Sequence, residues 1–102
     1  MSVPTDIRID AQEKEALRFA LDDFKGMIYL FGSRLDNIKK GGDIDILLIP
    51  QKKMNPLKLS IKVQTNFFSK CEENIDVVVY DKKSVFCQEI LKNAKRIDLA
   101  RI

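Results

Sequence analysis

The feature that most constrains this chain is an apolar run that opens with two aspartates, Asp43-Ile44-Asp45-Ile46-Leu47-Leu48-Ile49. Such a run predicts a β-strand, in which alternate side chains point to the same face, so Asp43 and Asp45 share one face. Two neighbouring carboxylates repel each other and are costly to desolvate, and a divalent cation between them relieves both costs. Aspartate oxygens suit Mg²⁺, which completes its coordination shell with water and substrate phosphates. The pattern therefore indicates phosphoryl-group chemistry.

A third carboxylate lies in a later run, Asn74-Ile75-Asp76-Val77-Val78-Val79-Tyr80. The β-branched residues predict a buried or half-buried strand, of which Asp76 is the only interior charge. An aspartate there is unfavourable unless it is paired, hydrogen-bonded or metal-bound, so the structural alternative is an ion pair with a lysine or arginine. If this strand lies beside the Asp43 strand, the three carboxylates could hold two metal ions about 3.5–4 Å apart, as in-line displacement at phosphorus uses.

A glycine-serine turn, Phe31-Gly32-Ser33, ends the apolar run that precedes Asp43 by nine intervening residues. Alone, this is an ordinary turn at the end of a strand. Because Gly32 has no Cβ, it would let the backbone approach a phosphate closely. Ser33 could offer its hydroxyl and N–H to a phosphate oxygen, and Arg34 could neutralise phosphate charge.

Gly32-Ser33, the Asp43-Ile44-Asp45 segment and the strand carboxylate Asp76 together resemble the DNA polymerase β-type nucleotidyltransferase superfamily. The small size resembles its minimal nucleotidyltransferase (MNT) branch, and the resemblance covers nearly the whole chain. It implies an ATP substrate and two Mg²⁺ ions. The implied catalytic and metal-binding residues are Asp43, Asp45 and Asp76, and the implied nucleotide-binding residues are Gly32, Ser33 and Arg34.

The resemblance leaves three functions open. The first is Mg²⁺-dependent transfer of AMP from ATP to an acceptor hydroxyl, which in the MNT branch is a tyrosine of a helical HEPN-type toxin that the MNT protein opposes as antitoxin. The second is a non-catalytic antitoxin that scaffolds or neutralises a HEPN partner by contact alone. The third is the catalytic subunit of a split small-molecule nucleotidyltransferase. The retained acidic residues favour an enzyme, because a scaffold has no need of buried charge.

Composition narrows the classes further. The 102 residues predict a single domain, 1–102, and the net charge of +3 is too small for the basic stripe of a nucleic-acid-binding protein. Histidine is absent, and Cys71 and Cys87 lack metal-ligand spacing, which argues against a zinc site. Neither a signal peptide nor a membrane-spanning run is visible, so a soluble cytoplasmic protein is expected.

Helical and strand patterns alternate along the chain, and they predict an α/β (α+β) fold with a small mixed sheet and helices packed on one face. Capping residues start three helices, and the first two strands form an antiparallel pair. The predicted elements are a helix from Asp10 with Glu13 as capping-box partner to near Gly26, strands 27–31 and 43–49, a helix from Asn55-Pro56 to about Cys71, a strand 75–80, a helix capped by Ser84, and a short edge strand within 96–99.

The apolar spacing also predicts which helix faces pack inward. In the helix after Pro56, the spacing singles out Leu57, Ile61, Gln64 and Phe68, with Phe67 beside them. In the last helix, the predicted apolar face consists of Val85, Ile90, Leu91 and Ala94.

Overall fold

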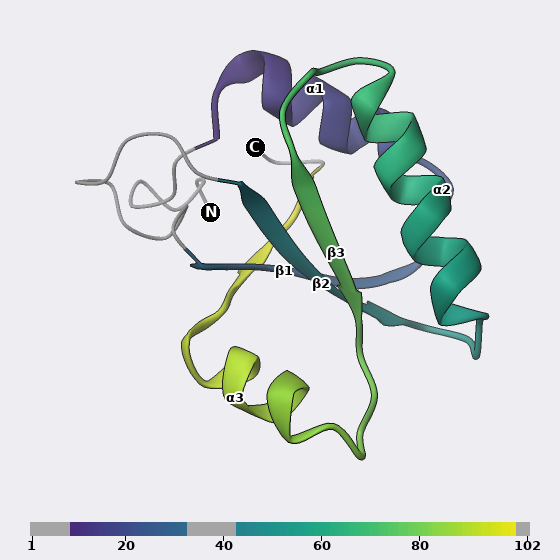
Figure 1. Ribbon diagram of the computed structural model, residues 1–102, viewed down its shortest axis with the longest axis vertical. Coiled ribbons are helices and arrows are strands. Elements are labelled where there is room, and N and C mark those ends of the chain that lie inside the picture. Colours follow the sequence, from purple (N-terminus) through teal and green to yellow (C-terminus); the bar gives the residue numbers. More distant parts are fainter. Residues whose placement is uncertain (1–8, 33–42, 100–102) are drawn as a thin grey trace.

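A computed structural model describes residues 9–32 and 43–99. Helices and strands alternate as the sequence predicts, and they form a four-stranded mixed sheet flanked by helices (Figure 1). None of the helices in these two ranges is long and apolar enough to cross a membrane. The elements are α1 (Ala11–Ala20), β1 (Gly26–Phe31), β2 (Ile44–Pro50), α2 (Pro56–Phe68), β3 (Ile75–Val79), α3 (Val85–Asn93) and β4 (Lys95–Ile97).

The sheet has the strand order β3-β2-β1-β4. Strand β1 is antiparallel to both β2 and β4, which confirms the predicted antiparallel pair and the short strand near the end of the chain. Strands β2 and β3 are parallel, and α2 makes the crossover between them. This crossover brings the amino-terminal ends of β2 and β3 together at one end of the sheet.

The predicted capping residues start all three helices. Asp10 accepts a hydrogen bond from the backbone N–H of Glu13 at 2.8 Å, and the Glu13 carboxylate accepts one from the N–H of Asp10 at 3.0 Å. Asn55 and Ser84 cap α2 and α3 in the same way, through the N–H groups three residues later. Each cap satisfies a backbone donor that the first helical turn would leave unpaired.

The first helix is shorter than predicted. It ends at Ala20 with Leu21 as its C-cap, and Gly26 opens β1 instead of ending the helix. Two consecutive aspartates, Asp22 and Asp23, follow the cap, and aspartate is a poor residue for a helix interior. A turn therefore replaces the last predicted turns of the helix, closed by a hydrogen bond from the Phe24 N–H to the Leu21 carbonyl at 3.0 Å.

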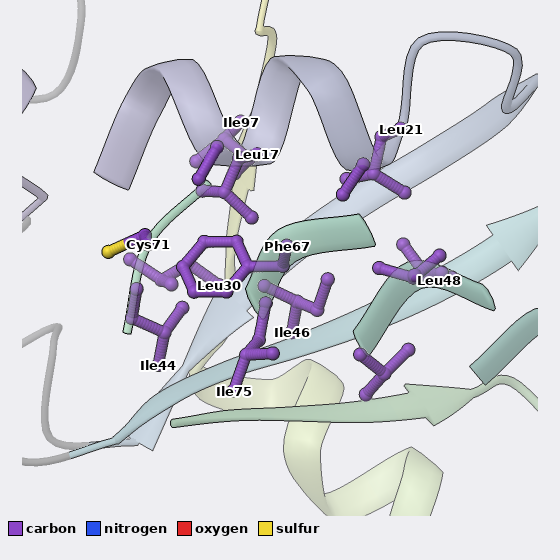
Figure 2. Packing of buried hydrophobic residues seen from close by; sticks show 14 of the residues in the cluster. Leu17, Leu21, Leu30, Ile44, Ile46, Leu48, Phe67, Cys71, Ile75 and Ile97 are labelled. Carbon is purple, nitrogen blue, oxygen red and sulfur yellow. The ribbon is translucent and has the colours of Figure 1, made fainter. Parts of the chain in front are cut away.

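The main core lies between the sheet and the pair α1–α2. Ile44, Ile46 and Leu48 of β2 point into it, as the alternation predicts, and all three are fully buried. Figure 2 shows the Phe67 ring of α2 in the middle of this cluster, close to the sheet residues. Burial of a side chain of this kind contributes about 1.5–3 kcal/mol, so this cluster is a principal source of stability.

The third helix packs on the other face of the sheet, which corrects the expectation that all helices lie on one face (Figure 1). Cys87 and Ile90 of α3 bury Leu47, whose side chain points away from its neighbours Ile46 and Leu48. Because β2 is apolar at successive positions, both of its faces need cover.

The second helix turns a different face inward from the one predicted. Leu59, Val63 and Phe67 are buried, whereas Leu57, Ile61 and Phe68 are 68%, 53% and 60% exposed. The helix thus carries two apolar stripes, and only one of them faces the core.

The prediction for α3 is also partly wrong. Val85 is 71% exposed, while Cys87, which the predicted face omitted, is buried beside Ile90.

Candidate active site

Two of the predicted site residues meet where β2 and β3 begin. Asp45 lies opposite Asp76 in the parallel register of these strands, and it lies opposite Phe31 in the antiparallel register of β1 and β2. Side chains of paired residues share a face of the sheet, so both carboxyl groups are on the face that carries Leu47 and α3. The condition for a shared acidic site, that the third strand lies beside the second, is therefore met.

The third carboxylate stands just before the strand. Asp43 precedes β2 by one residue and is exposed, and its negative charge acts on Asp45. Within residues 9–32 and 43–99, however, no three histidine, cysteine, aspartate or glutamate side chains form a group that could hold a metal ion by themselves. The described side chains thus supply a pair of carboxylates with a third charge nearby.

The environment of Asp45 raises the pKa of its carboxyl to about 6. Partial burial is the largest cause, followed by a hydrogen bond with Asp76 and the repulsion of the Asp76 and Asp43 charges. Each of these causes disfavours the ionised form. Near pH 6 the Asp45 carboxyl is therefore partly protonated, and within residues 9–32 and 43–99 no lysine or arginine forms an ion pair with it.

Asp76 is more exposed than its apolar run suggests. Because β3 is at an edge of the sheet and the α3 side chains pack around Leu47, Asp76 is exposed on the described surface while Asp45 is half-buried. The described lysines and arginines form no ion pair with Asp43, Asp45 or Asp76, so within this part of the chain the ion-pair alternative has no support. Partial burial makes the ionised form of Asp45 costly.

Gly32 makes room for the Asp45 carboxylate. Its backbone has φ +79°, in the left-handed region, and a Cβ at this position would lie 2.3 Å from Asp45 Oδ2. A side chain here would be both strained and in collision with the acidic pair. This contact was not foreseen from the sequence, which indicated only a close approach to phosphate, because it depends on the register of β1 with β2. Ser33 and Arg34, the other two predicted nucleotide contacts, lie outside the described residues.

This donor set fits Mg²⁺. The ion is commonly bound through one or two carboxylates, with water and substrate phosphates as the other ligands, so Asp45 and Asp76 suffice as protein ligands with Asp43 close by. The raised pKa of Asp45 agrees with this, because a bound cation would replace the Asp45 proton and reverse the electrostatic cost. Carboxylates in this arrangement can hold a cation and orient a hydroxyl group, which is the chemistry of group transfer at phosphorus.

Comparisons with known proteins agree with group transfer at phosphorus. The family model described as polymerase beta, nucleotidyltransferase matches residues 23–98. No curated protein matches the chain.

Several solved structures share the fold. The chain is similar to a chain of the tri-AMPylated Shewanella oneidensis HEPN toxin in complex with MNT antitoxin, with a TM-score of 0.60 and 23% identity over 83% of this chain and 67% of that one. It is also similar to a chain of a toxin–antitoxin structure with AMP-PNP, with a TM-score of 0.64 and 23% identity over 81% and 70%. A third similar structure is the toxin–antitoxin MntA–HepT, with a TM-score of 0.60 and 21% identity over 85% and 70%.

The family model covers all four strands and the acidic pair, and the solved structures share the arrangement of helices around the sheet. From this match, the chain belongs to the polymerase β nucleotidyltransferase family.

Proposed function

We propose that this chain transfers AMP from ATP to a hydroxyl group, a tyrosine of a HEPN-type protein partner, in a Mg²⁺-dependent reaction. The observation that carries the proposal is the in-register pair Asp45–Asp76, with Asp43 beside it, in a chain of the nucleotidyltransferase family. Such a site requires no nucleophilic histidine or cysteine, and the chain has no histidine.

Each acidic residue has a role in this proposal. Asp43 and Asp45 would hold a Mg²⁺ ion at the charged end of the nucleotide, and the ion would neutralise phosphate charge and orient the triphosphate for in-line attack. Asp76, the more exposed of the central pair, accepts the proton of the acceptor hydroxyl. The hydroxyl oxygen then bonds to the α-phosphorus, the bond from that phosphorus to the bridging oxygen breaks, and pyrophosphate leaves.

The choice of nucleotide and acceptor has support from the similar structures. One contains an AMPylated HEPN toxin with an MNT antitoxin, and another contains AMP-PNP, an ATP analogue. These structures favour adenylyl transfer to a protein over transfer to a small molecule. The present chain covers 67–70% of the corresponding chains in those structures.

Transfer of label tests the proposal. The purified chain is incubated with ATP labelled at the α-phosphate, Mg²⁺ and the protein encoded by the adjacent open reading frame. We expect label on the partner's tyrosine, released pyrophosphate, and a loss of at least about 100-fold in rate for Asp45→Asn or Asp76→Asn, the scale of losing a charge-stabilising catalytic group. Asp22→Asn is the matched control, because Asp22 is an exposed aspartate in the turn after α1.

The outcomes separate the candidate functions. Complex formation without label transfer would contradict the proposal and indicate a non-catalytic antitoxin. Transfer to a small hydroxylated molecule, with none to the partner, would indicate the split small-molecule enzyme.

A further inference from the structure

A pocket lies at the carboxyl ends of the parallel strands β2 and β3. Its volume of about 560 Å³ is within the range of roughly 300–1,000 Å³ that is usual for small-molecule sites. Ile49 and Val79, near the ends of the two strands, line it together with Met54 and Tyr80. In open sheets with parallel strands, ligands bind outside the carboxyl ends of those strands. The position and the size of the pocket therefore both suit a small ligand.

The pocket is separate from the acidic pair. Asp45 and Asp76 stand at the beginning of β2 and β3, whereas the pocket lies where these strands end. Leu47, which lies between Asp45 and Ile49 on the same face of β2, is fully buried under α3. The packing of α3 therefore closes the direct path along this face of the sheet between the two places.

Three lysines give the pocket an excess of positive charge. Lys52 and Lys53 follow β2, Lys82 follows β3, and all three are exposed. Within residues 9–32 and 43–99, none of them forms an ion pair. The pocket lining includes one carboxylate, that of Asp81, whose Oδ1 accepts a hydrogen bond from the Lys83 N–H at 2.9 Å. Three lysines against one aspartate leave the lining with two net positive charges.

The start of α2 adds to this positive charge. Pro56, the first residue of α2, lines the pocket, and the first turn of this helix has no acidic residue. The amino-terminal end of a helix carries a partial positive charge, which attracts anions. Side chains and backbone therefore both favour an anion in the pocket.

From these observations we infer that the pocket binds a small organic phosphate that also has an aromatic or apolar part. A phosphate group carries a charge of about −1.5 to −2 at neutral pH, which matches the charge excess of the lining, and lysine is a common phosphate ligand. The aromatic or apolar part lies against Ile49, Met54 and Val79. This inference does not depend on the proposed transfer reaction, because the pocket shares no residue with the acidic site.

Titration with phenyl phosphate, which joins an aromatic ring to a phosphate, tests the inference. The full chain, labelled with nitrogen-15, is titrated in the presence of a chelator, so that no metal at the acidic pair can hold the phosphate. Changes in the amide NMR signals give the Kd and locate the bound probe. Inorganic phosphate and phenol are titrated in parallel, because each has only one of the two groups.

Lysine variants identify the side chains that hold the phosphate. Lys52→Gln/Lys53→Gln and Lys82→Gln remove charge from the pocket, and melting curves check that these variants fold. Lys83→Gln is the matched control, since Lys83 is an exposed lysine next to Lys82 that does not line the pocket.

We expect phenyl phosphate to shift the amide signals of residues 51–54 and 79–82, and to bind at least about 10-fold more tightly than inorganic phosphate or phenol. The double variant and Lys82→Gln should each bind phenyl phosphate at least about 5-fold more weakly. Lys83→Gln should stay within about twofold of wild type, since its loss removes no contact in the pocket.

Four results would overturn the inference. The first is an absence of shifts at the pocket residues, and the second is equal binding of inorganic phosphate and phenyl phosphate, which would show attraction to lysines alone. The third is a loss of affinity in Lys83→Gln as large as in Lys82→Gln, or no loss in either pocket variant. The fourth is a peptide of four glutamates that shifts the same signals and binds more tightly than phenyl phosphate, since the pocket would then dock an acidic protein segment.

Discussion

At the scale of single residues, the site is built around one costly carboxylate. Asp45 is half-buried, beside Asp76 and within reach of the Asp43 charge, and these surroundings raise its pKa to about 6. A chain that served only as a folded scaffold would be more stable with a neutral group at this position. In the proposed function, Asp45 trades stability for the capacity to bind a cation.

The substitution Asp45→Asn measures this trade. Because the folded chain holds the Asp45 proton more tightly than the unfolded chain, the contribution of Asp45 to stability falls as pH rises from about 4 to about 6 and is constant outside that range. Without metal, Asn should match wild type at pH 4 and be more stable at pH 7. A gain of roughly 1 kcal/mol, reduced from the full effect of the pKa shift by solvent screening, corresponds to an increase in Tm of about 4–8 °C.

Thermal melts at pH 4 and pH 7 in the presence of a chelator check this prediction. Asp22→Asn, in an exposed turn, should show no such pH-dependent gain. An Asp45→Asn protein that is less stable than wild type at pH 7 would mean that the Asp45 charge is compensated in the folded chain.

Gly32 is the second residue on which the site depends. Gly32→Ala combines a left-handed backbone with a Cβ that would collide with Asp45 Oδ2, so the acidic pair must shift. We expect a cost of about 1–2 kcal/mol in stability and a loss of activity of at least about 100-fold, since misplacement by 1 Å is enough for such a loss.

The loss of activity should be larger than unfolding of the variant can explain. To check this, activity is assayed at a temperature at which circular dichroism shows that the variant is folded. Gly26 offers a contrast, because it also has a positive φ but a Cβ there would meet backbone at the opposite end of the β1–β2 pair. Gly26→Ala should therefore reduce stability without a specific effect on nucleotide binding. Equal activity in Gly32→Ala and wild type would contradict the role of Gly32.

At the scale of helices and strands, the sequence predicted where most elements begin better than which way they face. Asp10, Asn55 and Ser84 cap their helices because capping depends on groups only three residues apart. The inward face of α2 was predicted wrongly, because two apolar stripes occur on this helix and local spacing does not say which meets the sheet. The contact of Gly32 with Asp45 was also beyond local pattern, since it requires the register of two strands.

The capping box of α1 gives a prediction at this scale. Asp10→Ala removes the side-chain oxygen that accepts a hydrogen bond from the Glu13 N–H. This backbone donor then lacks that hydrogen bond at a residue that is only 2% exposed. We expect a loss of about 1 kcal/mol, seen as a lower midpoint of urea unfolding. Asp10→Asn or Asp10→Ser should recover most of the loss, because both residues are good N-caps; equal midpoints for the alanine variant and wild type would show that the cap is dispensable.

At the scale of the whole molecule, the sheet separates structural and functional tasks. The face under α1 and α2 carries the main core, while the other face carries both α3 and the acidic pair. The core and the site thus share β2, whose apolar and acidic side chains alternate at its start. Ligand binding at the site should therefore raise the free energy of unfolding of the entire domain.

Magnesium and nucleotide should stabilise the molecule in a pH-dependent way. Above pH 6 Asp45 is ionised in the free protein and open to a cation, whereas below pH 6 a proton competes for the same oxygens. We expect Mg²⁺ with AMP-PNP to raise Tm more at pH 7.5 than at pH 5. At pH 7.5, ligand at 100 times its Kd should stabilise the folded chain by about 2.7 kcal/mol. Chelation should remove the increase, and Asp45→Asn should show none at either pH. An equal increase at both pH values would indicate that the nucleotide binds without displacing a proton from the acidic pair, and the metal would then have to be placed elsewhere in the molecule.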